Sequence, residues 1–355
     1  MTHTIDYSAL TDPVSKQEVA TFKAETRASG ATWGSGALVQ GLAIGCAALV
    51  IAAVAIVLVG TFVSVSVNAF AASGSPTSLV GVVFPLLFLA GLVALSVAGI
   101  RSALGMGNWE KWMRLSRFAA ANQLVFSPSD PDPQYPGAIF GQGRSRKTLD
   151  HLRSVTDRFL DIGNYQYVTG SGKNSTTHNW GFMALHLDRR LPHMVLDSTA
   201  NNSWFGTNLP STFTKDQALS LEGDFDRYFT LYCPKEYERD ALYVFTTDLM
   251  ALLVDEAAPF DVEIVDDWMF VYSSKRFDPT SAALYQRLFR IIDTVGAKTL
   301  SQTDRYVDER VGTFAANTVA PQGQRLKKGV PVAAIVAGLV FGAIWLLPQI
   351  MDAFD

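Results

Sequence analysis

Three histidines and two aspartates are the first residues in this chain that could do chemistry. His178, His186 and His193 lie close together in the sequence, with Asp188 and Asp197 nearby. On a β-strand His186 and Asp188 point to the same face, an arrangement that suits metal ligands or an acid–base pair. Their spacing matches no known ligand signature. The sequence therefore favours polar residues on a sheet and predicts no catalytic, metal-binding or cofactor-binding residue among them.

A basic turn at residues 141–147 is the second candidate. Arg144, Arg146 and Lys147 follow two glycines there. Backbone amides and guanidinium groups bind anions, so this turn could hold a phosphate or approach anionic lipid headgroups. It lacks the spacing of a P-loop and of the dinucleotide fingerprint. We interpret it as an exposed loop, and the sequence leaves lipid contact open.

The remaining reactive residues make no case for an enzyme. Cys233 has no evident histidine or asparagine partner and is typical of a small core residue. Cys46 lies in an apolar run and cannot pair with it, so nothing indicates an oxidising compartment. Asp266 and Asp267 suit a tight turn better than a pair of catalytic carboxylates. The chain has no nucleophile-elbow, zinc-protease or paired-cysteine zinc motif.

Long apolar runs in the sequence indicate a membrane protein. Residues 28–100 include no Asp, Glu, Lys, Arg or His. A helix that crosses the hydrocarbon core needs about 20 mainly apolar residues. The sequence therefore predicts transmembrane helices at residues 37–63, 79–100 and 330–351, with a short external loop at 64–78. The absence of ionisable residues from all three spans argues against a proton relay or an ion pathway.

The basic residues beside these spans predict the orientation. Lys23 and Arg27 precede the first span, Arg101 follows the second, and Lys327 and Lys328 precede the third. By the positive-inside rule, the N-terminus and the main domain are cytoplasmic and the C-terminus is external. The polar leader at residues 1–36 has charges of both signs, so the first span is a retained anchor and not a cleaved signal peptide. The prediction is a multi-pass protein of a bacterial inner (plasma) membrane.

The polar part between the second and third spans predicts an α+β fold with a mainly antiparallel sheet. We expect a juxtamembrane helix at residues 101–122, one domain at 123–310 and a linker at 311–329. The juxtamembrane helix either lies on the membrane surface or continues the second span as a stalk. Expected strands lie at 158–169, 180–187, 193–196, 225–232, 241–245, 261–264 and 268–272. Expected helices lie at 248–257 and after Asp278, which would be the N-cap.

A pattern at residues 219–232 and 237–250 resembles a family. An acidic residue precedes an aromatic strand, and a Thr-(Pro)-x-(Phe/Leu)-Met helix start follows at residues 246–250, with Thr247 where the family pattern has proline. The pattern resembles bacterial membrane-anchored proteins, common in actinobacteria, whose cytoplasmic part is a domain of unknown function. The resemblance covers residues 118–290. It implies an α+β domain beside two N-terminal spans, and it implies no activity and no site residues.

Tethering at both ends favours a binding or scaffolding module at the membrane surface. The expected partners are the lipid bilayer and a membrane protein or a second copy of the chain, since Gly41 and Gly45 allow close helix packing, as do Gly338 and Gly342. The nearly balanced charge of the domain predicts no nucleic-acid partner. The alternative is an enzyme acting on a lipid or envelope precursor. It would use the basic turn as an anion clamp and one of the three histidines as a base.

Overall fold

The computed structural model describes residues 4–31, 33, 35–73, 87–91, 93–94, 97, 108–155, 158–202, 207–221, 223–311 and 317–329. The chain divides into two compact units. Residues 13–113 form the helical unit, and residues 1–12 together with 114–355 form the sheet unit. Helix α5 (Asn108–Ala121) contributes residues to both units.

The helical unit contains one long apolar helix. Helix α3 runs over Ser35–Ser73, and its segment Ala53–Ala72 is long and apolar enough to cross a membrane. This segment is the one that meets both conditions in the described part of the chain. Helix α3 continues into the loop predicted at 64–78, because the helix-breaking Gly74 and Pro76 come only after its end. The span predicted at 79–100 lies largely outside the described residues, and the span predicted at 330–351 lies wholly outside them.

Aromatic rings connect two helices of the helical unit. Helix α2 (Lys16–Ala28) begins with a capping box formed by Ser15 and Glu18. Trp109 of α5 packs edge-on against Phe22 of α2, with 6.4 Å between ring centroids, and the Lys23 ammonium lies 5.6 Å from the Trp109 ring centroid. The chain itself therefore covers the Trp109 side of the predicted juxtamembrane helix.

The first residues of the chain belong to the sheet unit. Asn122 donates a hydrogen bond to the carbonyl of Asp6 at 2.9 Å and accepts one from its amide at 2.8 Å. The Arg114 guanidinium donates to the carbonyl of Leu10 at the end of the short helix α1 (Ser8–Thr11), at 3.1 Å. The bond to Leu10 satisfies a carbonyl that the end of a helix leaves free. The start of the predicted leader is thus a folded part of this unit.

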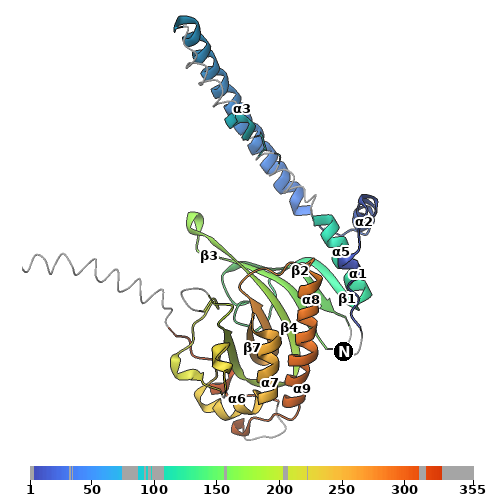
Figure 1. Cartoon of the computed structure of the whole chain (residues 1–355), viewed down its shortest axis with the longest axis vertical. Coiled ribbons are helices and arrows are strands. Elements are labelled where there is room, and N and C mark those ends of the chain that lie inside the picture. Colours follow the sequence, from blue (N-terminus) through green and yellow to red (C-terminus); the bar gives the residue numbers. More distant parts are fainter. Residues whose placement is uncertain are drawn as a thin grey trace, which may run out of the picture. The chain divides into compact units, whose positions relative to one another are not determined.

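Seven strands form one sheet in the sheet unit (Figure 1). All strand pairings among the described residues are antiparallel, which confirms the predicted α+β class with a mainly antiparallel sheet. The order is β1-β2-β3-β4-β6-β5, and β7 also pairs with β4. The strands are β1 (Leu124–Pro131), β2 (Arg144–Ser154), β3 (Leu160–Thr169), β4 (Thr176–Ser198), β5 (Ala218–Leu219), β6 (Phe229–Tyr232) and β7 (Asp261–Ser273).

Several predicted strands are longer or different in the structure. The hairpin of β3 and β4 agrees with the prediction, but β4 also includes the strand expected at 193–196. The turn expected at Asp266 does not form: Asp266, with a φ of 54°, lies inside the continuous strand β7, opposite a stretch of β4 where the register shifts. The basic turn is the start of β2, and part of the proline-rich loop expected at 127–137 is the edge strand β1, a position that tolerates proline.

Helices α7 (Thr247–Leu252), α8 (Ala282–Ile291) and α9 (Ala297–Thr303) lie over one face of the sheet (Figure 1). A Cβ placed on Gly296, between α8 and α9, would lie 3.0 Å from Leu185 of β4, so the helices pack directly on the strands. The strand predicted at 241–245 is wrong, because these residues lie in or next to helix α6 (Glu238–Val244), which buries Ala241 and Val244 at helical spacing. The N-cap of α8 is Ser281, not Asp278.

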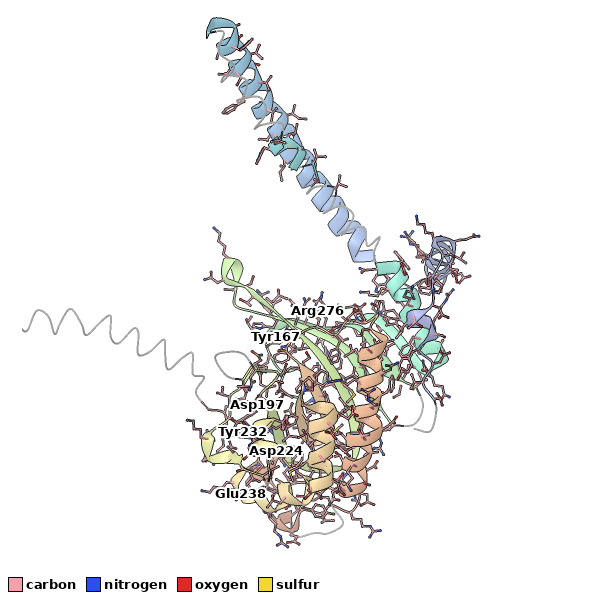
Figure 2. All side chains as sticks on the ribbon, in the orientation of Figure 1. Tyr167, Asp197, Asp224, Tyr232, Glu238 and Arg276 are labelled. Carbon is pink, nitrogen blue, oxygen red and sulfur yellow. The ribbon has the colours of Figure 1, made fainter. Side chains whose placement is uncertain are left out.

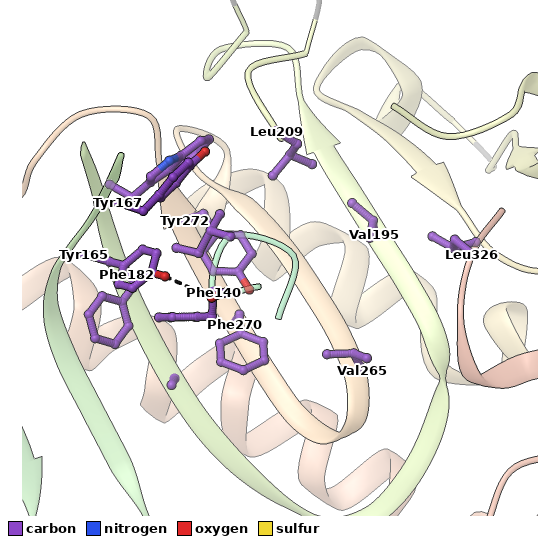
Figure 3. Packing of buried hydrophobic residues seen from close by; sticks show 13 residues of the cluster. Phe140, Tyr165, Tyr167, Phe182, Val195, Leu209, Val265, Phe270, Tyr272 and Leu326 are labelled. Carbon is purple, nitrogen blue, oxygen red and sulfur yellow. Dashed lines mark hydrogen bonds between the residues drawn. The ribbon is translucent and has the colours of Figure 1, made fainter. Parts of the chain in front are cut away.

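The opposite face of the sheet carries an aromatic core (Figure 3). Side chains alternate along a strand, so Phe270 and Tyr272 of β7 point away from the helices that contact Met269. Phe140 packs against Tyr165 with 4.7 Å between ring centroids, and the Tyr165 hydroxyl donates to the Phe140 carbonyl at 2.9 Å. The segment after β1 therefore folds back over this face.

Two buried carboxyl groups lie at the end of the β4–β7 pairing. Burial raises the pKa of Asp197 to about 6. Burial, and secondly the charge of Asp197, raise the pKa of Asp261 to about 7. An aspartate in an unfolded chain titrates near pH ~3.9, so at higher pH the folded chain binds more protons than the unfolded one. The stability that this pair contributes is full at low pH and is lost as the pH rises through 6 to 7.

We expect the melting temperature of the full chain, in metal-free buffer, to fall between about pH 5 and about pH 8 by more than that of an Asp197→Asn variant. The variant keeps the shape of the side chain but removes one of the two titrating groups. Thermal unfolding in detergent micelles measures both profiles, with the exposed Asp224→Asn as the matched control. Parallel profiles for the wild type and Asp197→Asn would contradict this expectation.

Candidate functional site

A cleft of about 740 Å³ opens on the aromatic-core side of the sheet, between the segment after β1 and the strands. Its floor is polar, and its walls are aromatic or proline side chains. Strands β2, β3, β4 and β7 each contribute to it. The lining residues are Asp130, Pro131, Pro133, Gln134, Tyr135, Thr148, His151, Arg153, Phe159, Asp161, His186 and Trp268.

A bulge and a glycine position His151 in the floor. The β2–β3 register shifts between Leu149 and Leu152, and Asp150 takes a φ of 47° there. The extra residue turns His151 towards β3. A Cβ on Gly163 of β3 would lie 2.3 Å from the His151 Cβ, so only glycine leaves room for the imidazole.

Both ring nitrogens of His151 have partners. Nδ1 lies 2.9 Å from Asp161 Oδ1, and Nε2 lies 3.1 Å from both Asp130 Oδ2 and the Thr148 hydroxyl. His151 and Asp161 are each 1% exposed. A carboxylate thus lies within hydrogen-bond distance of each ring nitrogen. The floor therefore holds its own charges in an internal network.

Two further side chains complete this network. The Tyr135 hydroxyl donates to Asp161 Oδ2 at 2.6 Å, and burial followed by the charge of Asp161 raises the pKa of Tyr135. Arg153 donates to Asp130 from the solvent side, with 40% of its side chain exposed. Asp161 and Asp130 thus each lie within hydrogen-bond distance of His151 and of a second group, Tyr135 for Asp161 and Arg153 for Asp130.

The walls of the cleft are three aromatic rings in edge contact. Trp268 lies 5.4 Å from Tyr135 and 5.5 Å from Phe159 between ring centroids, both at steep angles. His186, opposite Trp268 in the β4–β7 register, packs edge-on against the indole at 5.0 Å. The His186 side chain is 41% exposed and its Nε2 lies 3.4 Å from Asp267. The walls thus offer apolar surface with polar groups at the rim.

The structure separates the three histidines singled out in the sequence. His178 and His186 are about 26 Å apart along β4, at about 3.3 Å per residue. His178 stacks on Tyr167 at 4.7 Å and its Nε2 lies 2.8 Å from the Thr169 hydroxyl. His193 is buried and its Nε2 lies 2.8 Å from Glu263. Only His186 lies at the cleft.

The other sequence candidates are also in structural roles. Arg146 forms an ion pair with Asp132 at 2.7 Å, and Arg144 donates to the Gly170 carbonyl, so the basic segment is tied to neighbouring backbone and side chains. Asp188 accepts two hydrogen bonds from Arg158, which lower the pKa of that carboxyl. Cys233 is buried, and burial raises the pKa of its thiol to about 12, as expected for an inert core residue.

The sequence reasoning missed the residues of the floor. Asp130, His151 and Asp161 are far apart in the sequence, and Asp130 was placed in the proline-rich loop. One signal was present: His151 and Arg153 alternate with the apolar Leu152, which is the pattern of a strand with one polar face. Their partners could not be named without the strand register.

Comparisons with known proteins give one low-level structural likeness. No family model and no curated protein matches the chain. A solved structure, the crystal structure of the mycobacterial trehalose monomycolate transport factor A, TtfA, aligns with a TM-score of 0.34 and 10% sequence identity. The alignment covers 59% of this chain and 98% of that one. A likeness at this level is too low to assign the fold or the activity of that protein to this chain.

We expect Gly163→Ala to destabilise the sheet unit by about 1–3 kcal/mol or more, because the new methyl group overlaps His151 and forces the floor apart. Gly141→Ala is the matched control, since a Cβ there meets nothing within 4 Å. Thermal unfolding of the full chain in detergent compares the two variants. Equal melting temperatures would show that the close approach of His151 to Gly163 is not required.

Proposed function

We propose that this protein is a membrane-anchored binding module whose ligand, or a segment of a partner, occupies the cleft over His151. The observation that carries the proposal is the combination of a fully partnered polar floor with solvent-accessible aromatic walls. Such a surface suits a ligand with a flat apolar face and hydrogen-bonding groups along its edge.

The pairing of the floor supports binding over catalysis. A general base needs a free lone pair within reach of its substrate. Both nitrogens of His151 already face partners, and its ring is buried beneath the cleft. The enzyme alternative required the basic segment and a histidine to act together, and Arg144, Arg146 and two of the three histidines line no part of this cleft.

The walls and rim support recognition by shape and hydrogen bonding. Trp268, Tyr135 and Phe159 present edges and faces at steep mutual angles, which gives a rigid apolar surface at small entropic cost. Arg153 and His186 stand at the rim with about two-fifths of each side chain exposed. A ligand that stacks on the rings can therefore reach polar groups without disturbing the floor.

The anchoring is the second part of the proposal. Helix α3 supplies one segment able to cross a bilayer. We infer three spans in all, with the leader and the sheet unit in the cytoplasm, from the three apolar runs and the basic residues beside them. In this arrangement the module meets a membrane-bound partner or a second copy of the chain at the bilayer surface.

We expect a photo-crosslinking residue in place of Gln134, at the exposed rim of the cleft, to give a discrete adduct in intact membranes. The same residue in place of Lys173, at the tip of the β3–β4 hairpin, is the control and should not give that adduct. Trp268→Phe should keep the Gln134 adduct and Trp268→Ala should weaken it, because the first retains an aromatic wall. Identical adducts at both positions, or none at Gln134, would overturn the binding proposal.

The orientation has its own test. We expect a cysteine in place of Lys173, in a Cys233→Ser background, to react with a membrane-impermeant maleimide only after cells are permeabilised. Lys173 is exposed, so access depends on the side of the membrane alone. Labelling in intact cells would show that the sheet unit is external and would leave the cleft assignment unaffected.

A further inference from the structure

One end of the sheet is basic. The strand ends that meet there belong to residues 133–149, 162–187 and 268–277, which include no Asp or Glu. Figure 2 marks Arg276 toward this end, which carries the tip of the β3–β4 hairpin, and Glu238 of helix α6 toward the other. The whole chain has a formal net charge of -4, so this end departs from the average. Its six basic residues are Arg144, Arg146, Lys147, Lys173, Lys275 and Arg276.

An irregularity in β2 directs two of these side chains to one face of the sheet. The β2–β3 register shifts between Arg144, which pairs with Val168, and Lys147, which pairs with Gln166. Ser145, between them, takes a φ of 53°. Val168 and Gln166 are two residues apart on β3 and therefore point to the same face. Arg144 and Lys147, although three residues apart, consequently lie on that face together.

The same face carries further polar side chains across β4 to the segment after β7. Gln166 pairs with Asn179 of β4 and donates to its side-chain oxygen at 3.0 Å. The Arg276 guanidinium donates to the same oxygen from Nε at 2.9 Å. Each of these side chains is exposed or half-buried, as is that of Lys147. We call Lys147, Gln166, Asn179 and Arg276 the polar row.

The positive charge of this end is not neutralised within the fold. Arg146 forms an ion pair with Asp132. Within the described ranges, no ion pair reaches the other five basic residues. Asp278, the next carboxylate after Arg276, accepts from the amide and hydroxyl of Thr280. A surplus of exposed positive charge of this kind attracts a partner that carries repeated negative charge.

We propose that this end of the sheet docks onto the anionic phospholipid headgroups of the membrane that anchors the chain. The proposal rests on the anchoring part of the proposed function and is independent of what occupies the cleft. Helix α3 includes a segment able to cross a bilayer, so headgroups are present at high effective concentration. Each Lys or Arg near an anionic membrane surface strengthens binding about fivefold. The contact is electrostatic and leaves the side chains in the hydrated headgroup layer.

Docking through this end leaves the cleft accessible. Thr148 and Tyr165 pair with each other and are the neighbours in sequence of Lys147 and Gln166. Because side chains alternate along a strand, Thr148, which lines the cleft, points away from the polar row. A sheet unit held by an anchor alone can rotate, whereas one that also docks through its basic end presents the cleft in one orientation.

The test measures how closely the hairpin tip approaches the lipid headgroups when the full chain is reconstituted in nanodiscs. A donor fluorophore on Ser175→Cys, in a Cys46→Ser and Cys233→Ser background, transfers energy to an acceptor on the headgroups. We compare discs of phosphatidylcholine with discs that also include phosphatidylglycerol. We expect greater transfer in the anionic discs, and a fall to the phosphatidylcholine value in about 0.5 M salt, because salt screens exposed charges.

Charge reversal then assigns the effect to this end of the sheet. Lys173→Glu combined with Lys275→Glu should lower the ratio of docked to undocked chains by about 25-fold or more and remove the lipid-dependent transfer. Both side chains are exposed, so the melting temperature should not change. Arg239→Glu combined with Arg305→Glu is the matched control, since both residues line a separate hollow beside α6. The control should keep the transfer.

The possible results are distinguishable. Equal transfer in both kinds of disc, or equal loss in the two charge-reversed variants, would overturn the docking proposal, as would full transfer in Lys173→Glu with Lys275→Glu. A chain that does not enter the discs would refute the anchoring together with the docking. A chain that enters them without lipid-dependent transfer would refute the docking alone, and the photo-crosslinking test of the cleft would be unaffected.

Discussion

The pairing of strand β4 with three others is the constraint on which the rest of the structure depends. Its first half lies between β3 and β7, and its second half lies between β6 and β7. Between His186 and Met194 the register with β7 shifts twice. Before this stretch β4 pairs with β3 and β7, and after it β4 pairs with β6 and β7. The cleft lies before this irregular stretch, at His186, and the buried aspartates lie after it, at Asp197. The cleft and the aspartate pair therefore lie on different parts of one strand.

The division of roles inside the cleft follows from burial. A polar group removed from water must find a partner, and the floor does this internally through His151, Asp161, Asp130 and Arg153. Once these side chains have hydrogen-bond partners, they are poor reactants, but they hold the floor of the cleft in a fixed position. Specificity is then left to the rings and to the partly exposed Arg153 and His186. This is why we favour recognition over catalysis for the cleft.

Local patterns in the sequence were sufficient for part of this fold and failed where the outcome depends on distant partners. The β3–β4 hairpin and the helix near residue 250 follow from alternation, a polar loop and helical spacing, all read within a short window. Asp266 was correctly recognised as a residue tolerant of unusual dihedrals, but it lies inside a continuous strand opposite an irregular stretch of β4, and only the pairing with β4 reveals this. The floor of the cleft was missed for the same reason. Only the β2–β3 register shows that the bulge at Asp150 places His151 beside Gly163.

The segment that precedes the third apolar run is the remaining link between the sheet and the predicted anchors. Residues 317–329, expected as a linker, are bound to the sheet unit: the Lys327 amide donates to Gln217, and the Leu326 amide donates to His193 Nδ1 at 3.0 Å. Because Nδ1 accepts that bond, the proton of a neutral His193 sits on Nε2 and is donated to Glu263 of β7. Tyr272 and the Ala138 amide donate to the other oxygen of Glu263, and Ala138 belongs to the segment that also carries Tyr135. Two hydrogen-bonded residues, His193 and Glu263, thus connect Leu326 to the segment that forms one wall of the cleft.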